Sequence, residues 1–326
     1  MNKKVFNYGI IVALAVVAVF TSCKKNNDDE GDNDTKVEVD VYVAGVEGKY
    51  AVLWKNGVPQ YLTDGTKSAY AYSVYVSDGN VYVVGHVESV ATLWENGVVQ
   101  NLTDRYSSAY SVYVLDNDVY VAGTEQDVAK LWKNGVEQNL TDGTYGAEAF
   151  SVYVSGNDVY VAGVEYIVQE NTTTVAKLWK NGVVQNLTDG TYWWARAISV
   201  FVSDNDVYVA GCDEDTAKLW KNGVVQNLTD GTHANSVFVS DGNVYVVGRQ
   251  AWGETCGAKL WKNGVLQNLS NDAASANSVY VSDNNVYVAG YEGKIAKLWK
   301  NGIAQNLTEG IEEAVANSVF VVKRKK

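Results

Sequence analysis

The chain has 326 residues, 47% of them hydrophobic, so it is long enough to bury a large core. Its formal net charge of −12 at pH 7 argues against nucleic acid as a partner, because nucleic-acid-binding surfaces are basic. Only two histidines and three cysteines occur, and we expect neither a metal site nor another cofactor.

Residues 1–22 are typical of a secretory signal peptide, with two lysines near the start and an apolar run after them. The tetrapeptide that ends this segment, Phe20-Thr21-Ser22-Cys23, resembles a bacterial lipobox. That resemblance implies cleavage before Cys23, lipidation of its thiol and attachment to a membrane through the lipid. A plain N-terminal membrane anchor is the alternative.

Residues 23–36 contain no apolar side chain after the cysteine, so we expect a disordered acidic tether. Leader and tether together place the protein in the cell envelope, with the outer membrane as the expected location. The acidic run resembles signals that carry some lipoproteins to the cell surface. An ordinary spacer on a lipoprotein that faces the periplasm is the alternative.

A repeat of about 40 residues fills the remaining segment, 37–326. In one copy, four short segments rich in Val, Tyr and Leu are separated by turn residues, and none is long enough for a helix. They are Ser111–Val114, Asp118–Gly123, Ala129–Lys133 and Val136–Thr141. Each of the seven copies carries one tryptophan that we expect in the core: Trp54, Trp94, Trp132, Trp179, Trp220, Trp261 and Trp299.

Every copy also has an Asn-Gly pair after its tryptophan strand, the strongest short-range signal for a hairpin. The strands are apolar at successive positions, which indicates a small sheet covered on both faces by neighbouring sheets. The prediction is an all-β, seven-bladed β-propeller with four antiparallel strands per blade, forming one domain. Short Asp-rich runs such as Asp204–Asp206 resemble calcium loops only faintly, and we predict hairpin turns there.

The hairpin Ser73–Gly85, SVYVSDGNVYVVG, resembles the inner two strands of NHL and YVTN propeller repeats. The resemblance implies that SVYV is innermost and that the VQNLT segment lies at the rim. Pro59, the only proline, falls in a rim segment, where a missing N–H is tolerated. The first copy begins at its second strand and the last SVFV (Ser318–Val321) stands alone, so we predict that the C-terminal strand joins the N-terminal blade and closes the ring.

Insertions between copies fall on one face of the predicted disc, mainly over blades four to six. This face carries three tryptophans outside the repeat pattern, together with arginine and carboxylates, a combination that stacks on sugar rings or anchors a protein partner. The alternative is that these side chains only cover one another. The candidate ligand-binding residues are Tyr166, Trp193, Trp194, Arg196, Asp213, Glu214, Asp215, Arg249, Trp252 and Glu254.

A second asymmetry lies at the start of the innermost strands. Tyr72, Tyr110, Phe150 and Ile198 give way to Asn235, Asn277 and Asn317 in later copies, so one side of the channel mouth should be aromatic and the other amide-lined. Cys212 and Cys256 fall in loops of adjacent blades and could form a disulfide. We predict that His86 and His233 are surface residues of loops.

The leading functional hypothesis is a monomeric, non-enzymatic binding protein whose ligand is a glycan or a protein. A lectin-like variant would hold one shallow sugar site per blade. An extracellular hydrolase or lyase that uses acids such as Asp213 or Glu254 is the second hypothesis, with no catalytic residue assigned by a motif. The third is a structural platform for assembly.

Overall fold

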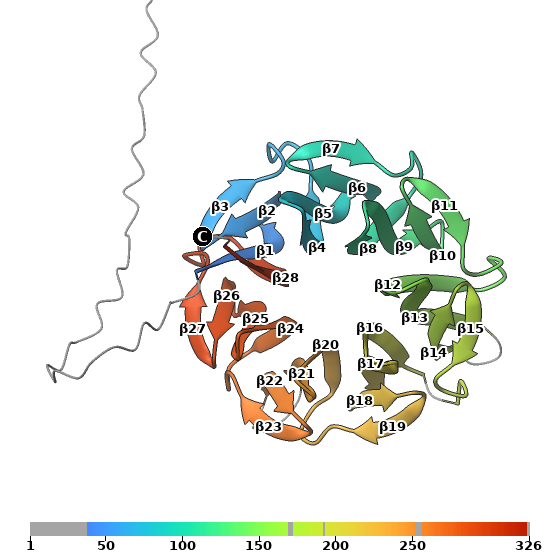
Figure 1. The fold of residues 1–326 in the computed structure, drawn as a ribbon. Helices are drawn as coiled ribbons and strands as arrows, with labels where there is room; N and C mark the ends of the chain where they lie inside the picture. The colour runs from blue at the N-terminus through green and yellow to red at the C-terminus, as the bar shows by residue number, and fades with distance from the viewer. Residues whose placement is uncertain (1–37, 169–171, 192, 252–255, 325–326) are drawn as a thin grey trace, which may run out of the picture. The chain divides into compact units, whose positions relative to one another are not determined.

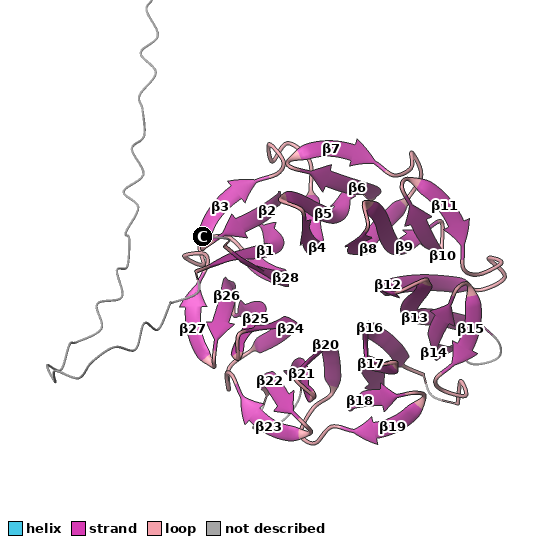
Figure 2. Cartoon of the chain, in the orientation of Figure 1, coloured by secondary structure: helices cyan, strands magenta, loops and turns pink. Residues whose placement is uncertain are grey.

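The computed structural model describes residues 38–168, 172–191, 193–251 and 256–324. These residues form seven four-stranded antiparallel sheets arranged as the blades of a β-propeller, which confirms the predicted fold (Figures 1 and 2). The predicted leader, Cys23 and the tether lie outside the described residues, as do Trp252 and Glu254. Among the described residues there is no helix with the length and apolar character needed to cross a membrane.

In each blade the strand order follows the chain from the axis to the rim, except in the blade that closes the ring. The innermost strands are β4 (Ala69–Ser77), β8 (Ser107–Leu115), β12 (Gly146–Ser155), β16 (Ala195–Ser203), β20 (His233–Ser240), β24 (Ala274–Ser282) and β28 (Ala314–Lys323). The second strands are β1 (Val39–Glu47), β5 (Asn80–Val87), β9 (Asp118–Glu125), β13 (Asp158–Val168), β17 (Asp206–Asp213), β21 (Asn243–Gln250) and β25 (Asn285–Glu292).

The third and fourth strands complete each blade. The third strands are β2 (Tyr50–Lys55), β6 (Val90–Glu95), β10 (Val128–Lys133), β14 (Thr172–Lys180), β18 (Thr216–Lys221), β22 (Gly257–Lys262) and β26 (Ile295–Lys300). The rim strands are β3 (Val58–Tyr61), β7 (Val98–Asn101), β11 (Val136–Asn139), β15 (Val183–Asn186), β19 (Val224–Asn227), β23 (Val265–Asn268) and β27 (Ile303–Asn306). Pro59 lies in β3, an edge strand, as predicted.

The tight turns form at Asn, Asp and Gly residues, which tolerate positive φ angles. Asn134 and Gly135 have φ angles of 52° and 78°, the left-handed pair that a type I′ hairpin needs, and the other six Asn-Gly pairs behave alike. The Asp-rich run at Asp204 and Asn205 is also a hairpin turn with positive φ angles. One face of the disc is therefore built from short turns, and we call it the tight-turn face. The opposite face, which carries the longer connections, is the insertion face.

The core lies between neighbouring blades. The seven repeat tryptophans are 0 or 1% exposed, which confirms their predicted place. Trp132, for example, packs against Val112 and Val114 of its own blade and Leu93 of the preceding one. Because each tryptophan helps to fill the space between two sheets, its burial stabilises the packing of neighbouring blades as well as the sheet to which it belongs.

The ring closes as predicted. Strand β28 pairs with β1 along its length, from Val39 opposite Lys323 to Glu47 opposite Ala314. Beyond the paired strands, Arg324 forms ion pairs with Glu38 at 2.9 Å and with Asp40 at 2.7 Å. Both Glu38 and Arg324 lie at the tight-turn end of these strands, so the described chain enters and leaves the propeller on that face.

Each innermost strand contains a β-bulge at the same place. We number the sheet of β28 and β1–β3 as blade one and the other blades in chain order, so blade five is β16–β19. In blade five the register shifts between Ala197 and Ser199, which leaves Ile198 without a partner on β17. The bulge brings the Arg196 carbonyl so close to Gly211 that a Cβ there would lie 1.9 Å from its oxygen. Glycine in the repeated VAG or VVG motif is thus what permits the bulge, and the bulge reorients the residues nearest the insertion face.

Below the bulges, the side chains around the axis form two closed layers. In the serine layer, each hydroxyl oxygen accepts a hydrogen bond from a valine N–H of the next blade at 3.1–3.3 Å. In the aromatic layer, seven rings contact one another in a circle with centroids 4.7–4.9 Å apart. The aromatic layer consists of Tyr75, Tyr113, Tyr153, Phe201, Phe238, Tyr280 and Phe320.

Candidate functional site

Two further layers lie above the serines, at the insertion face, and here the seven blades differ. The second layer holds the bulge residues: Tyr72, Tyr110, Phe150, Ile198, Asn235, Asn277 and Asn317. The first layer, two residues earlier on each strand, holds Tyr70, Ser108, Glu148, Arg196, His233, Ser275 and Val315. No other level of the central strands combines a carboxylate, a guanidinium, an imidazole and hydroxyls, so we take these layers as the candidate site.

The second layer is divided as the sequence predicted. Tyr72 and Tyr110 lie with ring centroids 5.4 Å apart, and Tyr110 and Phe150 at 5.5 Å. Burial raises the pKa of Tyr72 to about 12, and burial together with Glu148 raises the pKa of Tyr110 further, so both phenols stay neutral in the physiological range. This half of the layer offers ring faces and neutral hydroxyls.

The other half of the second layer is closed by amides. Asn235 donates to the Ala276 carbonyl at 2.9 Å, and Asn277 donates to the Ala316 carbonyl at 3.1 Å. Asn317 completes the series with a 2.9 Å bond to the carbonyl of Ala71. Because the amides of these three residues already bond to the backbone of the neighbouring blade, this half of the layer joins blades together. The side chains of the aromatic half are the ones that remain available to a ligand.

Glu148 is the centre of the polar contacts on the aromatic side. Its two carboxylate oxygens accept hydrogen bonds from Tyr110 at 2.8 Å and from Tyr166 at 2.5 Å. Tyr110 comes from the preceding blade, and Tyr166 from the extended second strand of the same blade. The carboxylate is therefore held in one orientation by two phenols.

Arg196 continues this network from the next blade. Its Nη2 donates to the Tyr166 hydroxyl at 3.0 Å, and its guanidinium carbon lies 3.9 Å from the Trp194 ring centroid. The same group lies 5.5 Å from the centre of Phe150. No ion pair to Arg196 forms among the described residues, and its Nε is buried without an acceptor. A half-buried cation fixed between aromatic rings is thus available to a ligand.

The histidines differ from the prediction. His86 and His233 lie in strands β5 and β20, half-buried beside the first two layers, because the strands extend beyond the repeat core toward the insertion face. His86 Nδ1 lies 3.2 Å from the Ser108 hydroxyl, and burial lowers its pKa. Burial lowers the pKa of His233 to about 4, and the charges of Arg249 and Arg196 act in the same direction.

The predicted ligand-binding residues fall into separate groups. Tyr166, Trp194 and Arg196 meet at the first layer, and Arg249 lies opposite His233 on β21. Asp213, at the end of β17, lines a groove between blades four and five, whereas Glu214 and Asp215 form the turn that follows. Trp193 is 75% exposed on the connection between those blades. Several of these residues were expected in loops but lie on strands, because the hairpins continue pairing into the insertions.

The two cysteines left open as a disulfide are both free. Cys212 lies within β17 and is fully buried opposite Arg196, so its thiol faces the blade interior and not the neighbouring loop. Burial raises its pKa to about 11, which keeps it a thiol. In the described part of the chain, no group of three or more His, Cys, Asp or Glu side chains is placed to hold a metal ion.

Sequence reasoning missed the residues of the first layer other than Arg196. Glu148, Ser108 and Tyr70 occupy the same aligned position in their copies, two residues before the bulge, where the seven copies carry six different residue types. Insertions drew attention to the loops, whereas these are single substitutions within a strand of otherwise constant sequence. Comparing the copies column by column would have found them.

Comparison with known proteins adds little to this description. No protein-family model matches the chain, and no curated protein matches it. Among solved structures, it is similar to the crystal structure of the computationally designed Ika8 protein in crystal packing No.1, space group P63. The two share 21% identity with a TM-score of 0.48, over 85% of this chain and 86% of that one. A similarity of this level implies nothing about function.

Proposed function

We propose that this protein is a non-enzymatic binding protein of the cell envelope that holds a glycan at the centre of the insertion face. The observation that supports this most directly is the network of Glu148, Tyr166 and Arg196 beside the rings of Tyr110 and Phe150. Sugars present apolar faces that pack on aromatic rings and hydroxyls that pair with carboxylates and guanidinium groups. The site offers both kinds of partner within one small area.

The proposed location rests on the sequence and on the path of the chain. A lipid on Cys23 would tether the propeller through residues 24–36, about 45 Å when fully extended. Since the described chain enters on the tight-turn face, an anchored propeller can turn its insertion face away from the membrane. Replacing Cys23 with Ser should abolish labelling by a radioactive fatty acid and release the protein from the membrane fraction; unchanged labelling would contradict this location.

A glycan array probed with the soluble chain from Lys36 onward tests the function. Two variants introduce the residue found at the equivalent position of another blade: Phe150→Ile copies Ile198, and Glu148→Ser copies Ser108. We expect each to weaken binding at least about tenfold, whereas Val183→Thr, at an exposed rim position, should leave it unchanged. Equal binding by all four proteins would move the site elsewhere, and no binding by any would favour a protein ligand or a structural platform.

A second candidate function rests on the contact between Ser108 and His86. A neutral imidazole 3.2 Å from a hydroxyl is the arrangement that activates a serine nucleophile, which would make the protein a hydrolase. Against this, the described residues contain no carboxylate hydrogen-bonded to His86. A serine-reactive fluorophosphonate probe decides between the two: labelling that is lost in Ser108→Ala would establish the hydrolase, and we expect no labelling.

A further inference from the structure

A second concave feature lies on the insertion face, between blades four and five. It is a groove of about 520 Å³, and blade four contributes Asn186, Leu187, Thr188 and Asp189. Blade five contributes Asp213, Lys218, Trp220 and Val225. The groove therefore combines two carboxylates, an ammonium group, an amide and a hydroxyl with apolar surface.

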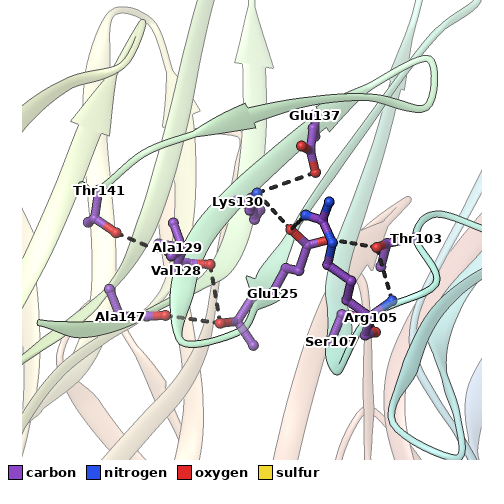
Figure 3. A network of polar contacts seen from close by, with 11 residues as sticks. Thr103, Arg105, Ser107, Glu125, Val128, Ala129, Lys130, Glu137, Thr141 and Ala147 are labelled. Carbon is purple, nitrogen blue, oxygen red and sulfur yellow. Dashed lines mark hydrogen bonds and ion pairs between the residues drawn. The ribbon is translucent and has the colours of Figure 1, made fainter. Parts of the chain in front are cut away.

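At the equivalent boundary between blades two and three, charged and polar side chains form a network of contacts (Figure 3). There Glu125 pairs with Lys130 at 2.8 Å and with Arg105 at 3.1 Å, and Thr103 donates to its other oxygen at 2.5 Å. Glu137 contacts the same lysine at 3.3 Å. The Glu125 and Lys130 side chains are only 2% and 5% exposed, so at this boundary the carboxylate already has all its partners within the protein.

Three residues distinguish the boundary between blades four and five from the one between blades two and three. Asp213 replaces Glu125, Gly190 replaces Arg105, and Val225 replaces Glu137 at the aligned positions. With one methylene fewer, Asp213 lies 4.0 Å from Lys218, whose ammonium donates instead to Asn227 at 2.9 Å.

As a result, Asp213 Oδ1 is buried without a hydrogen-bond partner. Burial raises the pKa of this carboxyl, and the nearby charges of Glu214 and Asp189 add to the effect, although Lys218 opposes it. A buried acceptor without a donor costs free energy that a ligand hydroxyl in the groove would recover.

The groove and the central site share one stretch of chain. Thr188 and Asp189 line the groove and begin the connection that carries Trp193 and Trp194 to Arg196. On the other side, Asp213 pairs in register with Ala195, the residue next to Arg196. The 75% exposed Trp193 lies on this connection, where a bare indole face can cover a sugar between the two places.

We propose that the groove is a second subsite for the same glycan, so that the ligand is a neutral oligosaccharide running outward from Arg196 past Trp193 to Asp213. This inference rests on the proposed function. In it, the Asp213 carboxylate, whose side chain is 16% exposed, rotates to bring its unpartnered oxygen to a sugar hydroxyl and accepts a hydrogen bond from it, and Asp189 and Asn186 offer further polar partners. The two carboxylates favour hydroxyl-rich units over acidic ones at this end.

The test is calorimetric binding of neutral cello-, malto- and manno-oligosaccharides, each from monosaccharide to hexasaccharide. We expect the affinity for one series to rise roughly tenfold between the shortest binder and the chain long enough to reach the groove. Asp213→Glu should restore the pairing seen at Glu125 and remove that rise, while leaving the shortest binder unaffected. Glu165→Asp, the reverse change at the boundary between blades three and four, serves as the matched control and should leave the rise intact.

The outcomes separate the two proposals. An affinity that does not depend on length, or a length dependence that survives in Asp213→Glu, overturns the second subsite while the central site stands. Absence of binding by all three series removes the proposed neutral ligand and with it this inference. Because Asp213→Glu introduces a residue that the fold already accommodates at Glu125, loss of folding is not expected, and a thermal melt of the variant verifies this.

Discussion

The seven innermost strands each have a lower half, toward the tight-turn face, and an upper half, toward the insertion face. The two halves belong to the same strands but differ in how uniform their side-chain contacts are around the ring. The serine and aromatic layers repeat one contact seven times and close on themselves. The two layers above them hold residues of several types, and their side-chain contacts link only part of the circle. A ring fixed by identical contacts below leaves the residues above it free to vary without loss of the fold, and that is where we place the ligand.

The largest effect should come from opening the ring. Truncation after Glu313 removes β28, with its serine, its aromatic ring and the buried Ala316, Val319 and Val321. We expect the thermal transition to collapse, because the lower layers can no longer close and β1 loses its partner. Near-ultraviolet circular dichroism of the tryptophans measures it.

The matched control for this truncation stops at Lys323 and keeps β28 whole. It loses the exposed ion pairs of Arg324 with Glu38 and Asp40, and exposed pairs contribute little. Its transition should stay close to that of the full chain. If the truncation after Glu313 melts like this control, ring closure by β28 does not stabilise the protein.

A pair of substitutions compares the two halves directly. Phe201→Ala breaks the aromatic layer and should cost about 3 kcal/mol, as expected for a large side chain removed from a packed ring. Phe150→Ile, in the second layer, should cost under about 1 kcal/mol, since Ile198 occupies the same position in blade five. Urea unfolding gives both values; equal costs would mean that the upper layer is as structural as the lower one.

Acid should destabilise the protein partly through the first layer. The pKa of His233 is lowered to about 4 from 6.5, so the unfolded chain binds its proton more readily than the folded one. This contribution is fully present above 6.5 and is lost as the pH falls toward 4. In His233→Ser, which copies Ser275, the melting temperature should fall less over that interval; an identical pH profile would show that His233 does not titrate in this way.

The smallest effect should be that of one serine. Ser199→Ala removes the hydroxyl that accepts the Val237 N–H at 3.2 Å, one of seven equivalent bonds. The cost should be about 1 kcal/mol, the usual net worth of such a bond. Ser236→Ala removes the equivalent bond to Val279 and should match it; a large difference between the two would show that the layer is not equivalent around the ring.

The fold was predictable because its determinants are local and repeated. The Asn-Gly turns determine the hairpins, and the tryptophan strands determine the core. The Ser318–Val321 segment stands apart from any complete copy, so only the first blade could supply its partner strand. Each inference needed only the sequence within one copy and the number of copies. Seven repetitions then made a weak signal strong.

The site was predictable only in part. Tyr166, Trp194 and Arg196 were expected together, and they meet. Glu148 was missed because its role depends on phenols from another blade and from an insertion, which no local pattern links. The sequence prediction grouped Asp213 with Arg196. Arg196 pairs with Cys212, however, and Asp213 is the next residue on that strand. Because successive residues of a strand point to opposite faces of the sheet, Asp213 lies in the groove and not beside Arg196.

The pairing of β28 with β1 also constrains how the molecule folds. The two strands that complete the ring are separated by nearly the whole length of the propeller, so the blade that they share cannot form until β28 has been synthesised. Until then β1 presents an unpaired edge, and the nascent chain has most of its blades but no closed circle. Folding of the propeller to the native state is thus postponed until β28 is available, when a single event converts a set of sheets into one cooperative unit.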